Sequence, residues 1–517
     1  MIVQSARVVD GVHATLYWRG RLRGMVAICL RILARSVGVA LAVGLVLPGV
    51  SAARGVFWSV QPTPLISAAQ GVSCVSASVC IAVGGAVQPG PGTMRWDGKR
   101  WRLEATPNPD PVRAKGLRGN DFFDGVSCAS SRFCVAAGGY ATKIYSPDGV
   151  HYVPVDRPLA ERWNGVKWSL LPFPRVPTGG QSGYLGAVSC TSSRACVAVG
   201  RFYVGNDPGL DERLLAERWN GRTWSVQSMP APAGVADPSI TAFSCSSSKF
   251  CIAVGSSDFG VGSQMFAERW DGSSWSPQPA PQIADTGDTQ LSGVSCTSST
   301  SCIAVGEYFG PSEPLQTLAE RWNGTNWTIQ STPNAPGGTN LLVGVSCTSG
   351  RACTAVGWTD VNSDSAPLVA RWDGARWSLE RTPNAHGASL EAVSCTSSVI
   401  CTAIGSTSCA YEGCPGAGDL VALQSVPAGA KLSGMPASCA SGRFTAQVTG
   451  SGISSVAWSV DSKRLKGHTV ARGTQYLASV LLSPGRHVLD VKVHFERSSQ
   501  TPALALHRIV RGCTPAH

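Results

Sequence analysis

One unit recurs along the chain, and its fifth copy reads LSGVSCTSSTSCIAVG at residues 291–306 and LAERWNGTNWTIQSTP at residues 318–333. Short apolar runs bounded by Ser, Gly, Asn and Pro are typical of β-strands. The unit therefore predicts four strands, at Leu291–Cys296, Cys302–Val305, Leu318–Trp322 and Trp327–Gln330. Repeats of about 40–50 residues with four strands each are typical of the blades of a β-propeller.

The number of cysteine pairs gives the number of copies. Each copy holds a C-x5-C pair, and there are seven such pairs at intervals of 48–62 residues. The seventh copy has a third strand at Leu420–Leu423 but lacks the fourth, Trp-led strand. Near the N-terminus, WSVQPTP at Trp58–Pro64 matches WTIQSTP at Trp327–Pro333. We predict an all-β, seven-bladed propeller at residues 53–429, with the N-terminal strand completing the last blade and leaving no long open edge.

The hairpin between the third and fourth strands carries a Trp at each end. Asn323-Gly324 predicts a two-residue type I′ turn, in which both residues have positive φ. That turn would place Trp322 opposite Thr325 and both indoles on one face. Because the Trp pair recurs in almost every copy, we interpret it as packing between blades rather than as a sugar-stacking site.

Two segments lie outside the repeats. Residues 1–52 contain several Arg, an apolar run from Val37 to Val50 and a small-x-small end at Ala52, which predict a secretory signal peptide. Residues 430–517 alternate in polarity and predict a second β-domain. Its expected strands are Phe444–Val448, Val456–Val460, Tyr476–Leu482 and Val488–Phe495.

Composition excludes several classes of protein. Of the 517 residues, 43% are hydrophobic and only 15% are charged, so the chain is neither disordered nor a coiled coil. A single long apolar stretch, near the N-terminus, excludes a polytopic membrane protein. The C-terminal segment has eleven Lys or Arg against three Asp or Glu, which favours contact with an anionic cell-wall polymer. We expect no nucleic-acid partner.

Eighteen cysteines remain after the predicted signal peptide, and an even number in an exported chain indicates disulfides. Zinc sites generally use closer ligand spacing and a second nearby pair, so we expect no metal and no cofactor. The predicted bridges are Cys74–Cys80, Cys128–Cys134, Cys190–Cys196, Cys245–Cys251, Cys296–Cys302, Cys347–Cys353, Cys395–Cys401, Cys409–Cys414 and Cys439–Cys513.

The acidic residues do not form the carboxylate pair that glycoside hydrolysis would need. Glu161, Glu217, Glu268 and Glu320 each precede an Arg at the same position of four copies. Paired carboxylates at one site would suggest glycoside hydrolysis, but one carboxylate per copy predicts ion pairs between blades. The segment 360–364 starts like a calcium loop but lacks the following Gly, and we interpret it as a solvated loop. No catalytic motif occurs, and we predict no catalytic residue.

The repeat unit as a whole resembles the Cys- and Trp-rich propeller repeats of secreted actinobacterial proteins. The segment Ser146–Tyr152 is similar to the Asp-box of sialidase-like propellers. The C-terminal stretches Ser455–Asp461 and Leu482–His487 resemble bacterial extracellular immunoglobulin-like β-sandwich modules. These resemblances imply the fold of each part and name no ligand.

Irregular segments between second and third strands are where binding is expected, because variable loops on a rigid scaffold commonly carry function. Three are long, at Ala141–Pro158, Arg201–Arg213 and Ser406–Asp419. Aromatic residues near the start of such segments are the candidate ligand-binding residues, unless they only anchor the loops. They are Tyr140, Tyr203, Phe259, Tyr308, Trp358 and Tyr411.

These patterns together predict a secreted, extracellular and cell-wall-associated monomer without catalytic activity. Its partner is expected to be an extracellular glycan, a cell-wall polymer or a protein. A glycan-cleaving hydrolase or lyase on the same face, and a structural cell-surface protein, are the alternatives.

Overall fold

The computed structural model describes most of the chain beyond residue 55. The described residues are 56–64, 69–87, 90–107, 109, 121–145, 152–172, 176–177, 180–204, 211–235, 237–257, 264–283, 288–310, 314–336, 338–361, 364–383, 387–407, 420–427, 429–436, 440, 443–465, 475–495 and 503–513. The predicted signal peptide lies outside them. In this part of the chain, no helix has the length and apolar character needed to span a membrane.

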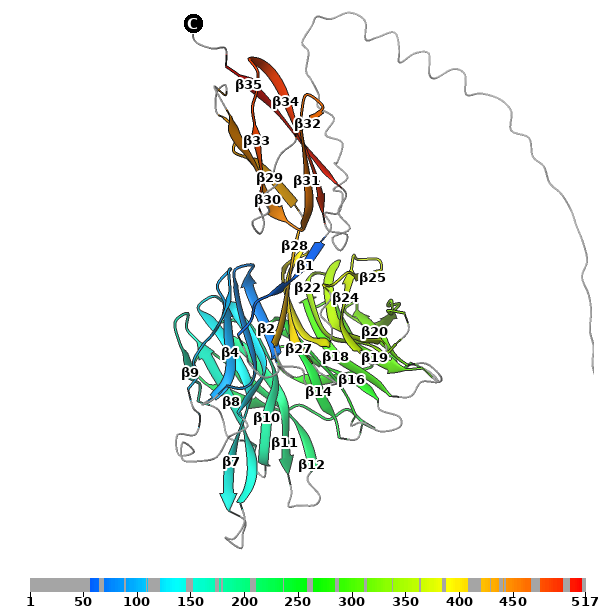
Figure 1. Ribbon diagram of the computed structural model, residues 1–517. Coiled ribbons are helices and arrows are strands. Elements are labelled where there is room, and N and C mark those ends of the chain that lie inside the picture. Colours follow the sequence, from blue (N-terminus) through cyan, green and yellow to red (C-terminus); the bar gives the residue numbers. More distant parts are fainter. Residues whose placement is uncertain are drawn as a thin grey trace, which may run out of the picture. The chain divides into compact units, whose positions relative to one another are not determined.

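Seven four-stranded antiparallel sheets occupy the described residues up to Pro427, and we number them as blades 1 to 7 in chain order (Figure 1). The first strands of the blades are β2 (Ala69–Ser76), β6 (Phe122–Ser130), β10 (Gly180–Ser192), β14 (Ser239–Ser247), β18 (Thr289–Ser298), β22 (Asn340–Ser349) and β26 (Ala388–Ser397). The second strands are β3 (Val79–Val87), β7 (Phe133–Tyr145), β11 (Ala195–Val204), β15 (Phe250–Ser256), β19 (Ser301–Phe309), β23 (Ala352–Val361) and β27 (Ile400–Thr407).

The outer half of each blade is a second hairpin. The third strands are β4 (Gly90–Trp96), β8 (Tyr152–Trp163), β12 (Asp211–Trp219), β16 (Met265–Trp270), β20 (Leu315–Trp322), β24 (Asp364–Trp372) and β28 (Leu420–Pro427). The fourth strands are β5 (Trp101–Leu103), β9 (Trp168–Leu170), β13 (Trp224–Gln227), β17 (Trp275–Gln278), β21 (Trp327–Gln330), β25 (Trp377–Glu380) and, for blade 7, β1 (Val56–Gln61). The predicted four strands per repeat are confirmed.

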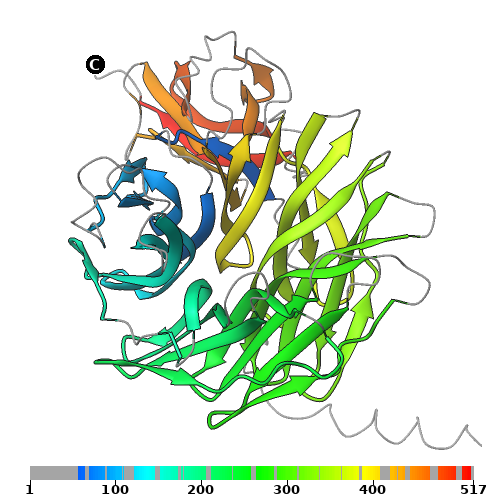
Figure 2. The ribbon, with the colours of Figure 1, turned by 90° about the horizontal axis from the view of Figure 1, so that it is seen from below.

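The blades surround a common centre (Figure 2), and their first strands contact one another in a closed cycle from β2 to β26 and back to β2. The S-C pair of each first strand, preceded by Val in six blades and by Phe243 in blade 4, explains this contact. Its Ser Oγ accepts a hydrogen bond of 2.9–3.0 Å from the Cys N–H of the next blade, and the same bond recurs at all seven boundaries. The repeated Ser is therefore a link between blades.

The hydrophobic core is divided among the boundaries between blades. Blades 4 and 5, for example, bury Ile252 and Val254 against Leu291, Trp322 and Trp327 in one cluster. A comparable cluster occupies each of the other six boundaries, including the one between blades 7 and 1. The Trp pairs therefore pack between blades, as predicted.

Strand β1 is the outer strand of blade 7. It pairs antiparallel with β28, with Val56 opposite Pro427 and Gln61 opposite Ala422. Trp58 is 1% exposed and packs in the cluster between blades 6 and 7. Its Nε1–H donates to Glu380 of blade 6 at 2.8 Å. The first described strand of the chain is thus paired with the last strand of the repeats.

The turn of the Trp hairpin differs from the predicted two-residue turn. Trp322 lies directly opposite Trp327, so the loop contains four residues. Asn323 Oδ1 accepts hydrogen bonds from the N–H groups of residues 325 and 326, at 2.9 Å each. Only Gly324 has a positive φ, of 103°. The Asn side chain organises the loop in place of a type I′ backbone. In six blades this brings the two indole centroids within 5.5–5.8 Å of each other.

The seven predicted bridges between first and second strands are confirmed. In blade 5, Cys296 and Cys302 are cross-strand partners. Cys513 is also disulfide-bonded, but its predicted partner Cys439 lies outside the described residues. So does the predicted pair Cys409–Cys414.

The C-terminal segment forms two further sheets that share one core. One sheet has the order β29 (Gly429–Ser433), β30 (Phe444–Ser451), β33 (Gln475–Val480). The other has the order β32 (Lys463–Arg464), β31 (Ile453–Val460), β34 (Gly485–Phe495), β35 (Leu504–Gly512). Val448 and Val480 of the first sheet are fully buried in one cluster with Leu489 and Val493 of the second. All four predicted strands are present, and β29, β32 and β35 were not predicted.

Candidate functional site

Four of the six candidate aromatic residues are described, and these four lie in strands rather than in loops. Tyr140, Tyr203, Tyr308 and Trp358 belong to β7, β11, β19 and β23, and each is half-buried. The predicted loops were too long because the hairpins continue outward. Residues 145 and 152 still pair in blade 2, and residues 204 and 211 still pair in blade 3. Phe259, Tyr411 and most of the third predicted loop lie outside the described residues.

These four aromatic residues differ in their surroundings. Tyr140 and Tyr308 pack against the buried clusters between blades 1 and 2 and between blades 4 and 5. The Tyr308 hydroxyl also donates to Gln316 Oε1 at 2.9 Å. Neither Tyr203 nor Trp358 belongs to a core cluster. Tyr203 and Trp358 are therefore the better candidates for contact with a ligand.

A Gly that recurs on the second strand of the blades is followed by a position at which the residue differs from blade to blade. In blade 5 this is Gly306 of the I-A-V-G segment, and a Cβ there would overlap the carbonyl oxygen of Gln290 on the first strand. No other residue fits so close to a backbone. The next residue varies from blade to blade, and so does its partner on the first strand. In blades 2 to 7 we call these residues the variable tier: Phe122, Gly139, Tyr184, Arg201, Ser239, Ser256, Gln290, Glu307, Leu341, Trp358, Ser389 and Ser406.

Between blades 2 and 3 the variable tier brings charged and aromatic side chains into contact. Arg201 forms an ion pair with Glu212, with Nη1 and Oε1 2.8 Å apart. Its Nε–H donates to the hydroxyl of Tyr184, and its guanidinium carbon lies 4.9 Å from the centre of the Tyr184 ring. A guanidinium held in this way by an acid and an aromatic residue is a fixed donor for an oxygen-rich ligand.

Blade 2 completes this group. The Phe122 ring meets the Tyr184 ring edge-on, with centroids 5.8 Å apart. Gly139 allows this approach, because a Cβ there would lie 2.9 Å from Phe122 and 3.0 Å from Tyr184. Asp124, two residues after Phe122, experiences the positive charge of Arg201. We call Phe122, Asp124, Tyr184, Arg201 and Glu212 the Arg201 cluster.

Burial tunes the acids of this region. It raises the pKa of Asp124 to about 7, although the charge of Arg201 acts in the opposite direction. Burial likewise raises the pKa of Tyr203 to about 12. In blade 5, burial raises the pKa of Glu307 to about 7, while a hydrogen bond of 3.3 Å from Ser292 lowers it. Asp124 and Glu307 can therefore exchange protons near neutral pH.

The four repeated glutamates do not form the predicted ion pairs. Glu161, Glu217, Glu268 and Glu320 are 0% exposed, and within the described residues their carboxylate oxygens have no hydrogen-bond partner. Burial raises the pKa of each to about 8. Arg218, expected to pair with such an acid, instead lies over the ring of Trp270 in the next blade, 5.9 Å from its centre. The aromatic partner satisfies the cation, and the acid is buried in its neutral form.

Sequence reasoning missed Asp124, Tyr184, Arg201 and Glu307. A signal for them exists, because aligning the copies shows the first position after the invariant Gly that changes from blade to blade. The aromatic residues were easier to notice because they stand out in composition. The partners of Arg201 on another blade could not be read from any local motif.

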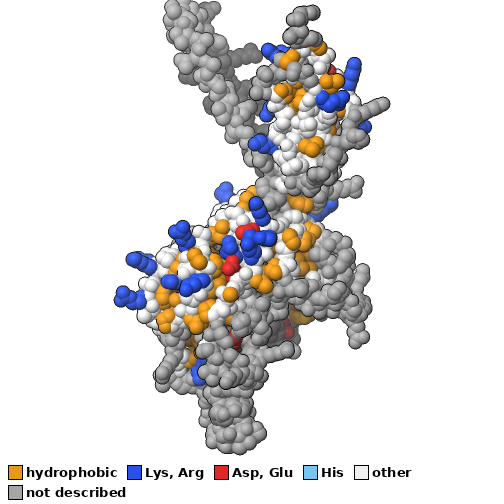
Figure 3. Space-filling model, turned by 60° about the vertical axis from the view of Figure 1, so that its left-hand side comes forward, with side chains coloured by type: hydrophobic (Ala, Val, Ile, Leu, Met, Phe, Trp, Pro, Cys, Tyr) orange, Lys and Arg blue, Asp and Glu red, His pale blue; other side chains and the backbone are white. Residues whose placement is uncertain are grey.

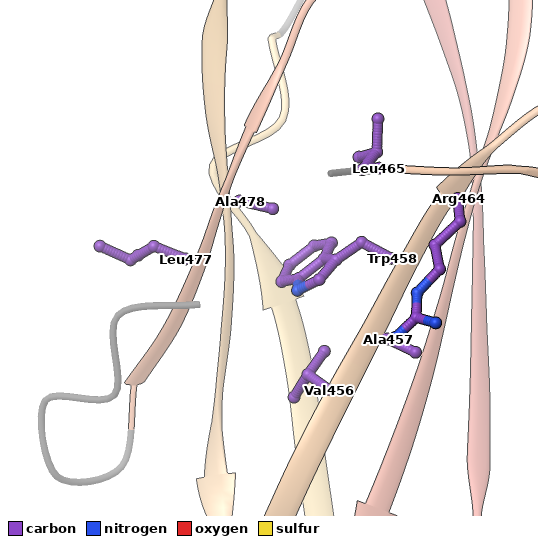
Figure 4. Close-up of a pocket in the computed structure, with 7 residues that line it drawn as sticks. All are labelled: Val456, Ala457, Trp458, Arg464, Leu465, Leu477 and Ala478. Carbon is purple, nitrogen blue, oxygen red and sulfur yellow. The ribbon is translucent and has the colours of Figure 1, made fainter. Parts of the chain in front are cut away.

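The C-terminal segment holds a cavity of about 70 Å³ (Figure 4). Trp458 projects between the two sheets toward Ala478, and its buried Nε1–H has no hydrogen-bond partner among the described residues. Sites for organic ligands usually measure about 300–1,000 Å³. This cavity has room for a few water molecules but not for a sugar.

A second group in the C-terminal segment has the order of a hydrolase triad. His487 Nδ1 lies 2.6 Å from Asp461 Oδ2, and His487 Nε2 lies 3.2 Å from Ser483 Oγ. However, Nε2 is closer to the carbonyl oxygen of Ser483, at 2.9 Å, and must donate to it. The pKa of His487 is raised by the hydrogen bond to Asp461 and then by that to Ser483. The imidazole therefore clamps a turn and is not a base for Ser483. No group of three or more metal-binding side chains occurs in the described residues.

No protein-family model matches this chain, and no curated protein matches it. Among solved structures, YCF48 from Cyanidioschyzon merolae is 16% identical, with a TM-score of 0.43 over 71% of this chain and 98% of that chain. An ulvan-cleaving polysaccharide lyase is 11% identical, with a TM-score of 0.41 over 67% of this chain and 93% of that chain. The six-bladed propeller lectin from Aleuria aurantia is 11% identical, with a TM-score of 0.34 over 62% of this chain and 98% of that chain. None of these likenesses assigns a ligand or an activity to this chain.

Proposed function

We propose that this chain is an exported binding protein whose propeller holds an extracellular glycan at the variable tier. The observation that carries the proposal is the Arg201 cluster. Repeated residues of the blades are already committed to packing and to the Ser–Cys links. The cluster instead breaks the repeat, and it joins aromatic rings, a cation and an acid from two blades at one end of their strands. Sugars are recognised by this combination, because their C–H faces stack on rings while their hydroxyls bond to charged groups.

Export belongs to the same proposal. Disulfides persist in oxidising compartments, and the seven bridges of the propeller fit an extracellular protein. The signal peptide expected at residues 1–52 would direct it there. We further propose that the two C-terminal sheets form an immunoglobulin-like module, and that β1 locks the ring of blades by completing blade 7.

Cleavage of the bound glycan is the second candidate function. It rests on Asp124, whose pKa of about 7 suits proton transfer and which feels the charge of Arg201. Beside a cation and a phenol, its protonated form could donate a proton to a glycosidic oxygen, and its carboxylate form could take a proton from an acidic C–H. Binding is preferred because Glu212 already neutralises Arg201 at 2.8 Å, and no second acid pairs with Asp124 among the described residues.

The test uses the mature chain, residues 53–517, screened against a panel of extracellular glycans for both binding and product formation. Arg201→Ala is expected to abolish binding of any glycan that the wild type retains. Arg222→Ala removes the same charge from the exposed hairpin loop of blade 3 and is expected to bind as the wild type does. Equal binding by wild type and Arg201→Ala would exclude the cluster. Product formation that Asp124→Asn abolishes, with binding retained, would make the protein an enzyme.

A further inference from the structure

The outer face of the sheet β32–β31–β34–β35 is strongly basic. Along β34 the buried residues Leu489, Val491 and Val493 alternate with residues that point to the opposite face. Four cations lie on that opposite face, by alternation and by cross-strand register. They are Arg464 on β32, Arg486 and Lys492 on β34, and Arg511 on β35, and all four are exposed. We call this surface the basic face. On the side shown in Figure 3, Lys and Arg side chains on this segment outnumber Asp and Glu.

Two arginines of the basic face oppose each other directly. Arg486 and Arg511 are cross-strand partners, and neither forms an ion pair with any described residue. Directly opposed side chains have Cβ atoms about 4.5–5.5 Å apart, and like charges in such a pair repel each other. Within the described residues of the face, Asp490 is the only acid. An anion between the two guanidinium groups would relieve the repulsion.

An exposed apolar pair lies next to the two arginines. Val488 is 39% exposed and Ile509 is 56% exposed, and they are cross-strand partners one step along the same face. The face therefore combines cations with a small apolar strip over a length of about 20 Å from Arg486 to Lys492. A linear polymer can lie along such a strip and present several charges to it.

We propose that the basic face binds a phosphate-rich linear polyanion, such as a phosphodiester-linked wall polymer. The charge of the segment supports this occupant, with eleven Lys or Arg against three Asp or Glu in residues 430–517. Three of the four cations are arginines, whose planar fork matches phosphate with two hydrogen bonds. This site is independent of the glycan site of the propeller and supplies attachment through charge.

The experiment measures binding of the mature chain to long-chain inorganic polyphosphate at several salt concentrations. The double variant Arg486→Ala/Arg511→Ala is expected to bind more weakly. The slope of log affinity against log salt should fall by about 1.4, because each phosphate contact on a single strand contributes about 0.7. The control variant Lys431→Ala/Arg443→Ala removes one charge from β29 and one from the residue just before β30, both in the other sheet. It should keep a slope close to that of the wild type.

Thermal melts of each variant control for folding. Arg486→Ala/Arg511→Ala removes the repulsion between the two side chains, so its melting temperature should be unchanged or raised. Arg486→Lys/Arg511→Lys keeps the charge without the fork and is expected to retain the salt slope but lose affinity. The proposal is overturned if the two Ala variants lose affinity equally, since net charge alone would then explain binding. It is also overturned if the protein binds anionic phospholipid vesicles but not polyphosphate, or binds neither.

Discussion

The Oγ atom of Ser394 in blade 7 accepts a hydrogen bond of 2.9 Å from the backbone N–H of Cys74 in blade 1, although the two residues lie 320 positions apart. The same bond joins each of the other six pairs of neighbouring blades. In one of them, the Cys347 N–H donates to Ser295 Oγ at 2.9 Å. The boundary between the last and first blades is thus built like the other six.

This equivalence gives the first prediction. Ser394→Ala and Ser295→Ala each leave a half-buried N–H without its partner, and each should lower the free energy of unfolding by about 1–2 kcal/mol. Denaturant titration of the two variants measures this loss. A much smaller effect of Ser394→Ala would mean that blades 7 and 1 are joined less tightly than the others.

The second prediction concerns the role of β1. Trp58 is buried between blades 6 and 7 and is bonded to Glu380, so Trp58→Ala should cost about 3–5 kcal/mol. Trp322→Ala, in the middle of the ring, is the matched control and should cost a similar amount. Deletion of residues 57–64 should destabilise all blades together, in one calorimetric transition. A truncated protein that melts at the wild-type temperature would show that β1 does not lock the ring.

The third prediction concerns the buried glutamates. Burial raises the pKa of Glu161, Glu217, Glu268 and Glu320 to about 8, so the folded chain holds these protons more tightly than the unfolded chain does. Stability should therefore fall as the pH rises from about 4.5, where unfolded glutamates ionise, to about 8, where the folded ones do.

The test compares the wild type with the variant that carries Gln at all four positions. At pH 5 the two proteins should unfold at similar denaturant concentrations, whereas at pH 8 the Gln variant should be the more stable. Parallel pH profiles for the two proteins would contradict the buried, neutral state of these acids.

The fourth prediction separates the aromatic residues at the ends of the second strands. Tyr308 packs on a core cluster and donates to Gln316, so Tyr308→Ala should cost about 2 kcal/mol of stability. Trp358 belongs to no core cluster, and Trp358→Ala should lower glycan binding with little change in melting temperature. Thermal melts and binding curves measured on the same preparations decide this. Equal destabilisation by both substitutions would assign Trp358 to the core.

The fifth prediction concerns the two predicted bridges that involve cysteines outside the described residues. Cys513 is disulfide-bonded, and its N–H donates to Ala440 O at 2.9 Å, one residue after Cys439. Peptide mapping without reduction should find Cys439 joined to Cys513 and Cys409 joined to Cys414, with no free thiol. A bridge between different blades in the peptide map would contradict this pairing.

The sequence alone determined the number of blades, their four-strand plan and the seven bridges within them. Each of these features is local and is repeated. Each C-x5-C pair closes the short hairpin between the first two strands of a blade. Because the pair occurs seven times, it indicates seven blades. The turn of the Trp hairpin was predicted wrongly because an Asn-Gly pair suits two kinds of loop. The side chain of Asn323 decides between them by bonding to residues 325 and 326.

Only the tertiary structure decided which residues could act together. Arg201 and Glu212 lie on neighbouring strands of blade 3, but Asp124 and Phe122 reach the same place from blade 2. The sequence predicted that the four repeated glutamates form ion pairs. In the structure, packing between blades buries them, and Arg218 lies over Trp270 instead. The physical reason is common to both cases. Packing within a blade depends on residues close in the chain and recurs as a visible motif, whereas contacts across a blade boundary depend on how two surfaces align in space.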